Sequence, residues 1–225
     1  GYSAHALIRS PHAPWSRVAG TVRRPEKAEA LRKEGVAAYP LAGVANPADL
    51  ADEIRHADAI LVSAPPSAEG DPTLDRFAGL VASAPNAAWI GYLSTTGVYG
   101  DHGGSWVDEA TAATPQSRSS ELRFAAEQAW RSLGRESGKS VQIFRLTGIY
   151  GPGRNALASL AQGTARRIVK PGQVFNRIHV ADIAATLLAS LRKPRSGAVY
   201  NVSDDEPAPP QDVVAFAAEL VGVAA

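Results

Sequence analysis

Hydrophobic and polar positions divide most of the chain into alternating strand-like and helix-like segments. Short apolar runs predict strands at residues 17–22, 36–39, 59–62, 88–93 and 141–146. Helical patterns separate them at residues 25–34, 46–55, a segment that starts at Asp71-Pro72, and 122–133. Alternation of this kind, with connections of helix length, predicts an α/β fold: a Rossmann-type, doubly wound parallel sheet.

Punctuating residues set the expected helix boundaries. Asn46-Pro47 and Asp71-Pro72 each combine a capping side chain with a first-turn proline, and Gly35 suits the left-handed residue after a helix. The clearest helix has apolar residues at i, i+3, i+4, i+7, i+8 and i+11: Leu122, Ala125, Ala126, Ala129, Trp130 and Leu133. We expect Gly134 to end it.

The rhythm changes after Tyr150. A short helix is expected at residues 155–161, and residues 167–180 predict a small strand pair that turns at Pro171-Gly172. A helix at 182–191, a strand at 198–202 and a helix at 211–221 follow. We therefore expect a Rossmann domain over residues 1–150. Residues 151–225 should contribute late sheet elements and a small C-terminal substrate lobe.

Composition narrows the class of protein. The 225 residues carry a net charge of +1 without long blocks of one sign, so the chain shows no sign of a nucleic-acid or membrane partner. No apolar run approaches the roughly 20 residues that span a bilayer, and no signal peptide is recognisable, so we expect a cytoplasmic protein. There is no cysteine, and the five histidines lack metal-ligand spacing, so no metal site is predicted.

The first four residues resemble the end of a dinucleotide-binding loop. Gly1-Tyr2-Ser3-Ala4 matches the second glycine and the last position of G-x-G-x-x-G/A, and the residues from Ala4 to Ile8 favour a helix. The chain has no methionine, so we expect the first strand and first glycine to precede Gly1. A helix start without a ligand is the alternative interpretation.

The ends of two predicted strands carry further candidates. Arg23 and Arg24 stand where an acidic residue would hold the ribose of NAD, and their guanidinium groups favour the 2′-phosphate of NADP instead. Two solvated arginines are the alternative. Ser63, Ala64 and Pro65 follow another strand, where small side chains permit close approach of a cofactor, although a proline-stiffened loop explains them equally well.

Five downstream motifs occur in the order and spacing of one family. They are Leu93-Ser-Thr-Thr-Gly-Val-Tyr-Gly100, Trp106-Val-Asp-Glu109 with Thr114-Pro115, Arg145-Leu-Thr-Gly-Ile-Tyr-Gly-Pro-Gly153, Ile178-His-Val-Ala-Asp-Ile183, and Tyr200-Asn-Val-Ser203 with Glu206-Pro207. Together they resemble extended short-chain dehydrogenases/reductases of the NAD-dependent epimerase/dehydratase type. The chain is most similar to the atypical YeeZ-like group of predicted nucleoside-diphosphate-sugar epimerases.

This resemblance implies NADP, or alternatively NAD, as the cofactor and a small-molecule substrate such as a nucleotide-sugar. It also implies that Ser94, Thr95, Arg123, Thr147 and Gly148 line the cofactor site, with Arg123 bonding the ribose. By the same resemblance, two copies pair through two helices as a homodimer. Arg166, Arg167 and Arg177 would face a substrate diphosphate by the same analogy, or else are solvated charges.

The family's catalytic pattern is incomplete in this chain. Thr95 matches the Ser/Thr that polarises the substrate oxygen, but Ser119 stands at the position of the tyrosine and Arg123 at that of the lysine. A serine hydroxyl does not replace a phenolate, and an arginine does not exchange protons near neutral pH. Tyr99 and Tyr150 are alternative acid/base candidates, weighed against a packing role with a bonded hydroxyl.

Two functions remain open on these residues. The first is an NAD(P)-dependent oxidoreductase or epimerase with an atypical active site, which the motif order and Thr95 support. The second is a non-catalytic NADP-binding sensor or regulatory protein, which the replacement by Ser119 and Arg123 supports.

Overall fold

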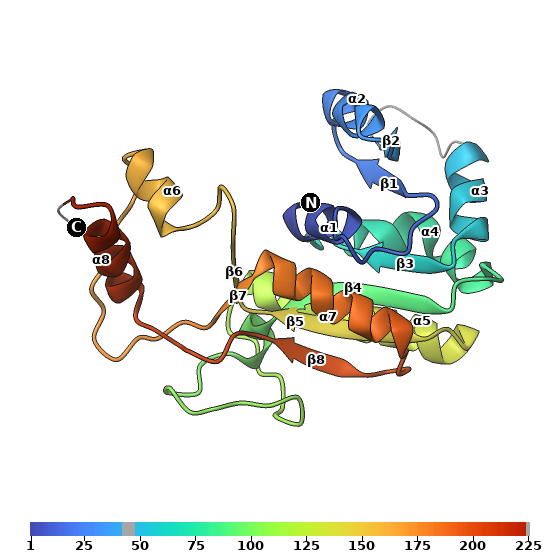
Figure 1. Ribbon diagram of the computed structural model, residues 1–225. Coiled ribbons are helices and arrows are strands. Elements are labelled where there is room, and N and C mark those ends of the chain that lie inside the picture. The colour runs from blue at the N-terminus through green and yellow to red at the C-terminus, as the bar shows by residue number, and fades with distance from the viewer. Residues whose placement is uncertain (42–47, 224–225) are drawn as a thin grey trace.

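The computed structural model describes residues 1–41 and 48–223 as an α/β structure (Figure 1). Its elements are α1 (Tyr2–Ile8), β1 (Ala19–Val22), α2 (Pro25–Lys33), β2 (Ala37–Pro40), α3 (Ala48–His56), β3 (Ala59–Val62), α4 (Pro72–Ser83), β4 (Trp89–Thr95), the 3-10 turn Thr96–Tyr99, α5 (Arg118–Ser137), β5 (Val141–Leu146), β6 (Gly148–Tyr150), α6 (Ala156–Ala161), β7 (Arg177–His179), α7 (Val180–Arg192), β8 (Val199–Val202) and α8 (Pro210–Leu220). The Asn46-Pro47 cap lies outside the described residues.

A parallel sheet with strand order β3-β4-β5-β8 forms the centre of the fold. All three of its pairings are parallel, with Val62 opposite Tyr92 and Leu146 opposite Val202 at the carboxyl ends. This confirms the predicted α/β class with a Rossmann-like sheet. β1 and β2 form a separate parallel pair, and within the described residues neither is hydrogen-bonded to β3.

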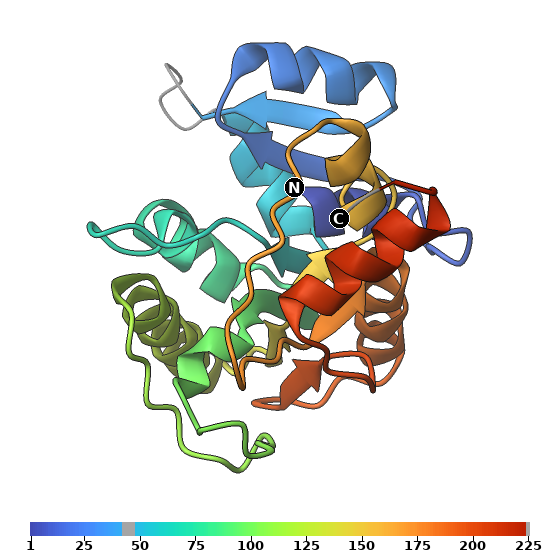
Figure 2. The same ribbon diagram turned by 90° about the vertical axis from the view of Figure 1, so that its left-hand side faces the viewer.

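Helices cover both faces of this sheet, as Figure 2 shows in the second view. On one face α1 and α7 pack together, and Leu7, Ile183 and Leu187 share a buried cluster with Phe144. On the other face α3, α4 and α5 supply Leu50, Phe77, Val81 and Trp130 to a second cluster. Two apolar faces with helices on each explain why the strands are continuous apolar runs rather than alternating ones.

The predicted Asp71 cap forms, but α5 ends later than the sequence pattern predicts. Asp71 accepts hydrogen bonds from the amides of Thr73 and Leu74, which confirms the start of α4. α5 continues through Gly134 and ends at Gly138, whose φ is +70°. Gly134 is buried because α5 lies close to β5: a Cβ there would be 2.9 Å from Val141 Cγ2. This glycine permits helix–strand contact and does not terminate the helix.

The predicted strand pair within residues 167–180 was wrong. Residues 164–176 form no strand beyond a single bridge from Phe175 to Ala208, and Pro171-Gly172 makes a turn without a hairpin. β7 instead pairs in parallel with β6, a three-residue strand that the sequence pattern did not reveal. Short strands of this kind carry too few side chains for a period of two to be recognised. α6 and α8 pack together away from the sheet (Figure 1).

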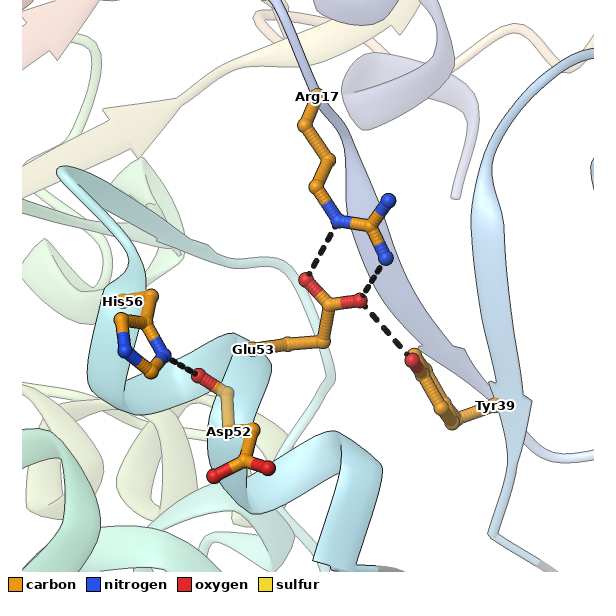
Figure 3. Close-up of polar contacts among 5 residues, drawn as sticks. All are labelled: Arg17, Tyr39, Asp52, Glu53 and His56. Carbon is orange, nitrogen blue, oxygen red and sulfur yellow. Dashed lines mark hydrogen bonds and ion pairs between the residues drawn. The ribbon is translucent and has the colours of Figure 1, made fainter.

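A polar cluster joins the β1–β2 pair to α3 (Figure 3). Arg17 donates through Nε and Nη2 to the two oxygens of the Glu53 carboxylate. The distance from Nε to Oε2 is 3.0 Å. The Tyr39 hydroxyl donates to the same carboxylate over 3.0 Å. The Arg17 hydrogen bond, followed by that of Tyr39, holds the pKa of Glu53 below its usual range although burial opposes this. Glu53 thus fixes the small sheet through an ionised side chain.

Helices long and apolar enough to span a bilayer are absent from the part of the chain that the structure describes.

Candidate functional site

The predicted cofactor residues follow the carboxyl ends of parallel strands. Arg23 follows β1, Ser63 follows β3, Thr95 is the last residue of β4, and Thr147 follows β5. β4 runs two residues further than the pattern predicted, so Ser94 and Thr95 belong to the sheet. In an open α/β sheet, ligands bind in the crevice outside these carboxyl ends. Ser63, Thr95 and Thr147 therefore lie at the carboxyl edge of the β3-β4-β5-β8 sheet, and Arg23 lies at the carboxyl end of the separate β1–β2 pair; together they are the candidate cofactor residues.

Gly1 and the end of β3 meet at this edge. Gly1 is the N-cap of α1, and a Cβ placed on it would lie 3.8 Å from Ser63 Oγ. Ser63 and Pro65 are exposed, Ala64 and Ala4 are half-buried, and Ser3 is buried. Positions that the sequence linked to a dinucleotide on separate grounds are therefore neighbours in space.

Tyr2 connects the same helix start to the segment after β6. Its hydroxyl donates to the carbonyl of Pro152 over 3.0 Å, and the Arg154 guanidinium lies 5.7 Å from the ring centroid. Gly151 has a φ of +152°, and a Cβ there would be 2.7 Å from the Tyr2 hydroxyl oxygen and 3.3 Å from His179 Nε2. Gly151 is thus required for this close approach. The Gly-Pro-Gly sequence signalled a loop but not this contact.

Arg23 and Arg24 are both exposed just beyond β1. Arg24 is the N-cap residue of α2 and has extended backbone geometry. Among the described residues neither guanidinium makes an ion pair. Both groups are therefore available to an anionic ligand such as a phosphate.

Thr95 sits beside a small cluster of serine hydroxyls. Its Oγ1 accepts a hydrogen bond from the Gly97 amide over 3.1 Å, which leaves its own proton free for a ligand oxygen. A Cβ on Gly97 would lie 3.4 Å from Thr95 Oγ1 and 3.0 Å from Ser120 Oγ. Ser120 is buried and receives a hydrogen bond from the Ser117 hydroxyl, the cap of α5.

Ser119 and Arg123 are placed differently from a Tyr–Lys pair that faces a substrate. Ser119 is exposed, and its hydroxyl bonds with that of Ser117 over 3.2 Å. Arg123 donates to the carbonyl of Leu93 over 3.0 Å and lies over the ring of Tyr92. Burial raises the pKa of Tyr92 to about 12 although Arg123 opposes the shift. Arg123 therefore supports the end of β4.

A buried ion pair lies next to Thr95 that the sequence did not reveal. Glu127 on α5 is fully buried and accepts hydrogen bonds from Arg145 Nε and Nη2 on β5, at 3.1 and 2.7 Å. The Ser94 hydroxyl, which was assigned to the cofactor, donates to Glu127. The Arg145 guanidinium lies 4.7 Å from the centroid of the Tyr99 ring. In the sequence, Glu127 has the pattern of an ordinary exposed polar residue of a helix, so nothing there predicts its burial.

The two alternative tyrosines differ in environment. Tyr99 is buried, and its hydroxyl donates to Asn201 Oδ1 over 2.8 Å, as a packing tyrosine does. Tyr150 is half-buried, with its ring edge-on to His179 at 5.2 Å. Burial, and then the negative charge of Asp204, raises the pKa of Tyr150. The phenol of Tyr150 therefore holds its proton more tightly than a free tyrosine does.

The last two predicted residues are held in backbone interactions. Thr147 donates through Oγ1 to the carbonyl of Val202 over 3.2 Å, and the Gly148 amide donates to the carbonyl of Asn176 over 3.1 Å. Gly148 itself is exposed. The predicted site residues thus divide into a group open to a ligand at the sheet edge and a group that supports it from within.

The open group fits a dinucleotide in its chemistry. Gly1 next to Ser63 leaves backbone accessible at a helix start. Two guanidinium groups that form no ion pair with any described residue follow β1, and the Thr95 hydroxyl has a proton to donate. These are the donors that phosphate and carbonyl oxygens accept from.

Comparison with known proteins gives a consistent family. The model of the NAD dependent epimerase/dehydratase family matches residues 80–203. Protein YeeZ of Escherichia coli strain K12 is 31% identical over 212 residues, which cover 90% of this chain and 74% of YeeZ.

Solved structures share the fold along the whole chain. A functionally unknown conserved protein from Silicibacter pomeroyi DSS is 46% identical with a TM-score of 0.88, and the match covers 100% of this chain and 77% of that one. The dTDP-glucose 4,6-dehydratase of Bacillus anthracis, solved in complex with NAD, is 18% identical with a TM-score of 0.77, over 99% of this chain and 77% of the other.

Proposed function

This chain belongs to the NAD dependent epimerase/dehydratase family, and from that premise we propose that it binds NADP, with NAD as the alternative. We propose further that it acts as an oxidoreductase or epimerase on a nucleotide-sugar or a similar small polyol or carbonyl compound. The dTDP-glucose dehydratase that shares its fold acts on such a sugar nucleotide, as its name states.

One observation carries this proposal: the free hydroxyl proton of Thr95 at the carboxyl end of β4. Because the Gly97 amide already donates to Thr95 Oγ1, that oxygen is oriented and its proton points elsewhere. A substrate carbonyl or alcohol oxygen at the sheet edge is the natural acceptor. Thr95 thus polarises the oxygen at the reacting carbon.

The remaining residues bind and orient. Gly1 to Ala4 and Ser63 to Pro65 would hold the pyrophosphate and its surroundings, and Arg23 and Arg24 the 2′-phosphate of NADP. A nicotinamide held by these residues would supply the hydride acceptor or donor for the substrate carbon. Tyr150 keeps its phenol proton because its pKa is raised, and it would donate a hydrogen bond to the substrate oxygen.

A specific observation favours the second candidate, a non-catalytic NADP-binding sensor. Ser119 is exposed and bonded to Ser117, and Arg123 is engaged with Leu93, so the usual acid/base pair has no counterpart at these two positions. Binding of the dinucleotide does not require that pair, whereas rapid proton transfer does.

We also propose a homodimer formed through α4 and α5. An open groove runs between these helices and is lined by small or apolar residues, among them Leu74, Ala78, Ala82, Ala129 and Leu133. Ala125 and Ala129, part of the apolar stripe of α5, are exposed. The stripe is therefore wider than the face that packs on the sheet, which supports a second helical contact.

Titration with NADPH and with NADH, followed by fluorescence, tests the proposal. Hydride transfer and epimerisation are then screened across a panel of nucleotide-sugars. We expect NADPH to bind more tightly than NADH, and turnover to fall strongly in Thr95→Val, which removes the hydroxyl but keeps the shape. Tight binding without turnover across the panel would favour the sensor, and no binding of either cofactor would exclude both functions.

A further inference from the structure

The buried charge pair of Glu127 and Arg145 lies near the site and has no role in the proposed function. Their side chains are 0% and 5% exposed, and the two carboxylate oxygens meet two guanidinium nitrogens. Burial is the largest single influence on the pKa of Arg145 and lowers it, but the hydrogen bonds and charges of Glu127 and Tyr99 together raise the pKa above its ordinary value. The two side chains therefore meet in the geometry of a buried ion pair.

This pair contacts both ends of the segment that carries Thr95. At one end the Ser94 hydroxyl donates to Glu127. At the other end the Arg145 guanidinium lies against the Tyr99 ring, 4.7 Å from its centroid. Thr95 is the last residue of β4, and the following residues 96–99, which include the Gly97 amide that orients Thr95, form a short 3-10 turn.

The same segment is also connected to β8 and to the loop before α5. Tyr99 donates to Asn201 Oδ1, and the Asn201 amide donates to Glu109 over 2.7 Å. The Thr114 hydroxyl donates to the carbonyl of Tyr99. A chain of polar contacts thus runs from α5 through β5 to the far side of the segment.

A buried ion pair of this kind adds little net free energy to folding, so stability alone does not explain the arrangement. Taking two charges out of water costs as much as their attraction returns, and apolar residues of similar volume often replace such a pair without loss. An ion pair does fix the orientation of its side chains, because guanidinium and carboxylate meet in one bidentate geometry. Apolar side chains would fill the space without fixing Ser94 or Tyr99.

We propose that Glu127 and Arg145 are positioning residues that hold segment 94–99, and with it the Thr95 hydroxyl, in the geometry of the candidate site. The role at the site rests on the proposed function, whereas the ordering of the segment does not. Neither side chain touches a ligand; both act through Ser94 and Tyr99.

The test uses a double variant that removes the charges but keeps the volume, Glu127→Leu with Arg145→Met. Glu127→Gln is the single variant, and Glu121→Gln, which removes an exposed carboxylate from the same helix, is the matched control. Hydrogen exchange of segment 94–100 is measured by mass spectrometry, together with thermal unfolding and NADPH titration.

We expect the double variant to unfold near the wild-type temperature but to exchange the amides of segment 94–100 at least tenfold faster. Its NADPH affinity should also fall about tenfold, while Glu121→Gln behaves as wild type. Wild-type exchange in a folded double variant would overturn the proposal. If the double variant does not fold, Ser94→Ala, which cuts only the link to Glu127, must show the faster exchange.

The two proposals fail separately. A wild-type protein that binds neither NADPH nor NADH would refute the proposed function, and hydrogen exchange would still decide whether the ion pair orders the segment. Normal NADPH binding together with unchanged exchange would leave the proposed function standing and refute the positioning role.

Discussion

At the scale of single residues, the proposed preference for NADP rests on Arg23 and Arg24. Both are exposed just after β1, and neither is paired within the described chain, so a 2′-phosphate would meet two free guanidinium groups. Replacing both by glutamate removes these donors and adds repulsion. We expect NADPH affinity to fall about tenfold to a hundredfold, since a hydrogen bond to a charged group contributes roughly 1.5–3 kcal/mol.

NADH provides the control for that prediction, because it lacks the 2′-phosphate. Its dissociation constant, measured by the same fluorescence titration, should change little or improve in the double variant. Equal weakening of both cofactors would refute the 2′-phosphate assignment and would indicate damage to the shared part of the site.

The sequence predicts which residues lie near the site, but it does not predict their hydrogen-bond and ion-pair partners. Motif and strand-end positions predict Thr95 and the two arginines as candidates, and in the structure each stands at the carboxyl end of a parallel strand. The sequence does not predict the role of Glu127, because its partner Arg145 is 18 positions away on another element. A sequence pattern records spacing along the chain, whereas a buried ion pair depends on a contact that only packing creates.

Element boundaries depend on close contacts of the same kind. Gly134 looked like a helix end, yet α5 continues because glycine lets the helix approach β5. Gly134→Ala places a methyl 2.9 Å from Val141 Cγ2 and 3.1 Å from the carbonyl of Lys139. We expect a loss of about 1–3 kcal/mol in the free energy of unfolding, measured by urea denaturation.

The control for this change is Gly79→Ala on α4. Its Cβ would have no atom within 4 Å, so alanine should stabilise the helix by about 0.5–1 kcal/mol through its better helix propensity. If Gly134→Ala were as stable as Gly79→Ala, close packing of α5 on β5 would not explain the buried glycine.

The contact between α3 and the β1–β2 pair should depend on pH. Hydrogen bonds from Arg17 and then Tyr39 lower the pKa of Glu53 from its ordinary value of 4.5. A lowered pKa in the folded state stabilises the protein above that ordinary value, and this contribution is lost as the pH falls through the folded value. Glu53→Gln should therefore lower the unfolding temperature at pH 7.

The difference between Glu53→Gln and wild type should shrink as the pH is lowered from 5 toward 3, as followed by thermal unfolding at several pH values. Glu29→Gln, an exposed change on α2, serves as the control and should follow the wild-type curve. A gap that stayed constant with pH would show that the Glu53 carboxylate is not the source of the stabilisation.

For the whole molecule, alternation of strands and helices was sufficient to predict the class of fold. Strands buried on both faces carry a strong apolar signal, and all five that the pattern predicted before Tyr150 are present. Beyond Tyr150 the signal weakened, because β6 and β7 have three residues each and their partners come from distant parts of the chain. Local periodicity does not encode such pairings.

The groove between α4 and α5 makes the homodimer testable at this same scale. Ala82 and Ala129 line it from the two helices, so an arginine at each would place charge and bulk in the proposed contact. We expect the wild type to show twice the monomer mass by light scattering, and the double variant Ala82→Arg, Ala129→Arg to be monomeric with an unchanged unfolding temperature. Ala185→Arg, on the exposed side of α7, adds the same side chain elsewhere and should remain dimeric. A wild-type protein that is monomeric at high concentration, or a double variant that still pairs, would show that this groove is not the dimer contact.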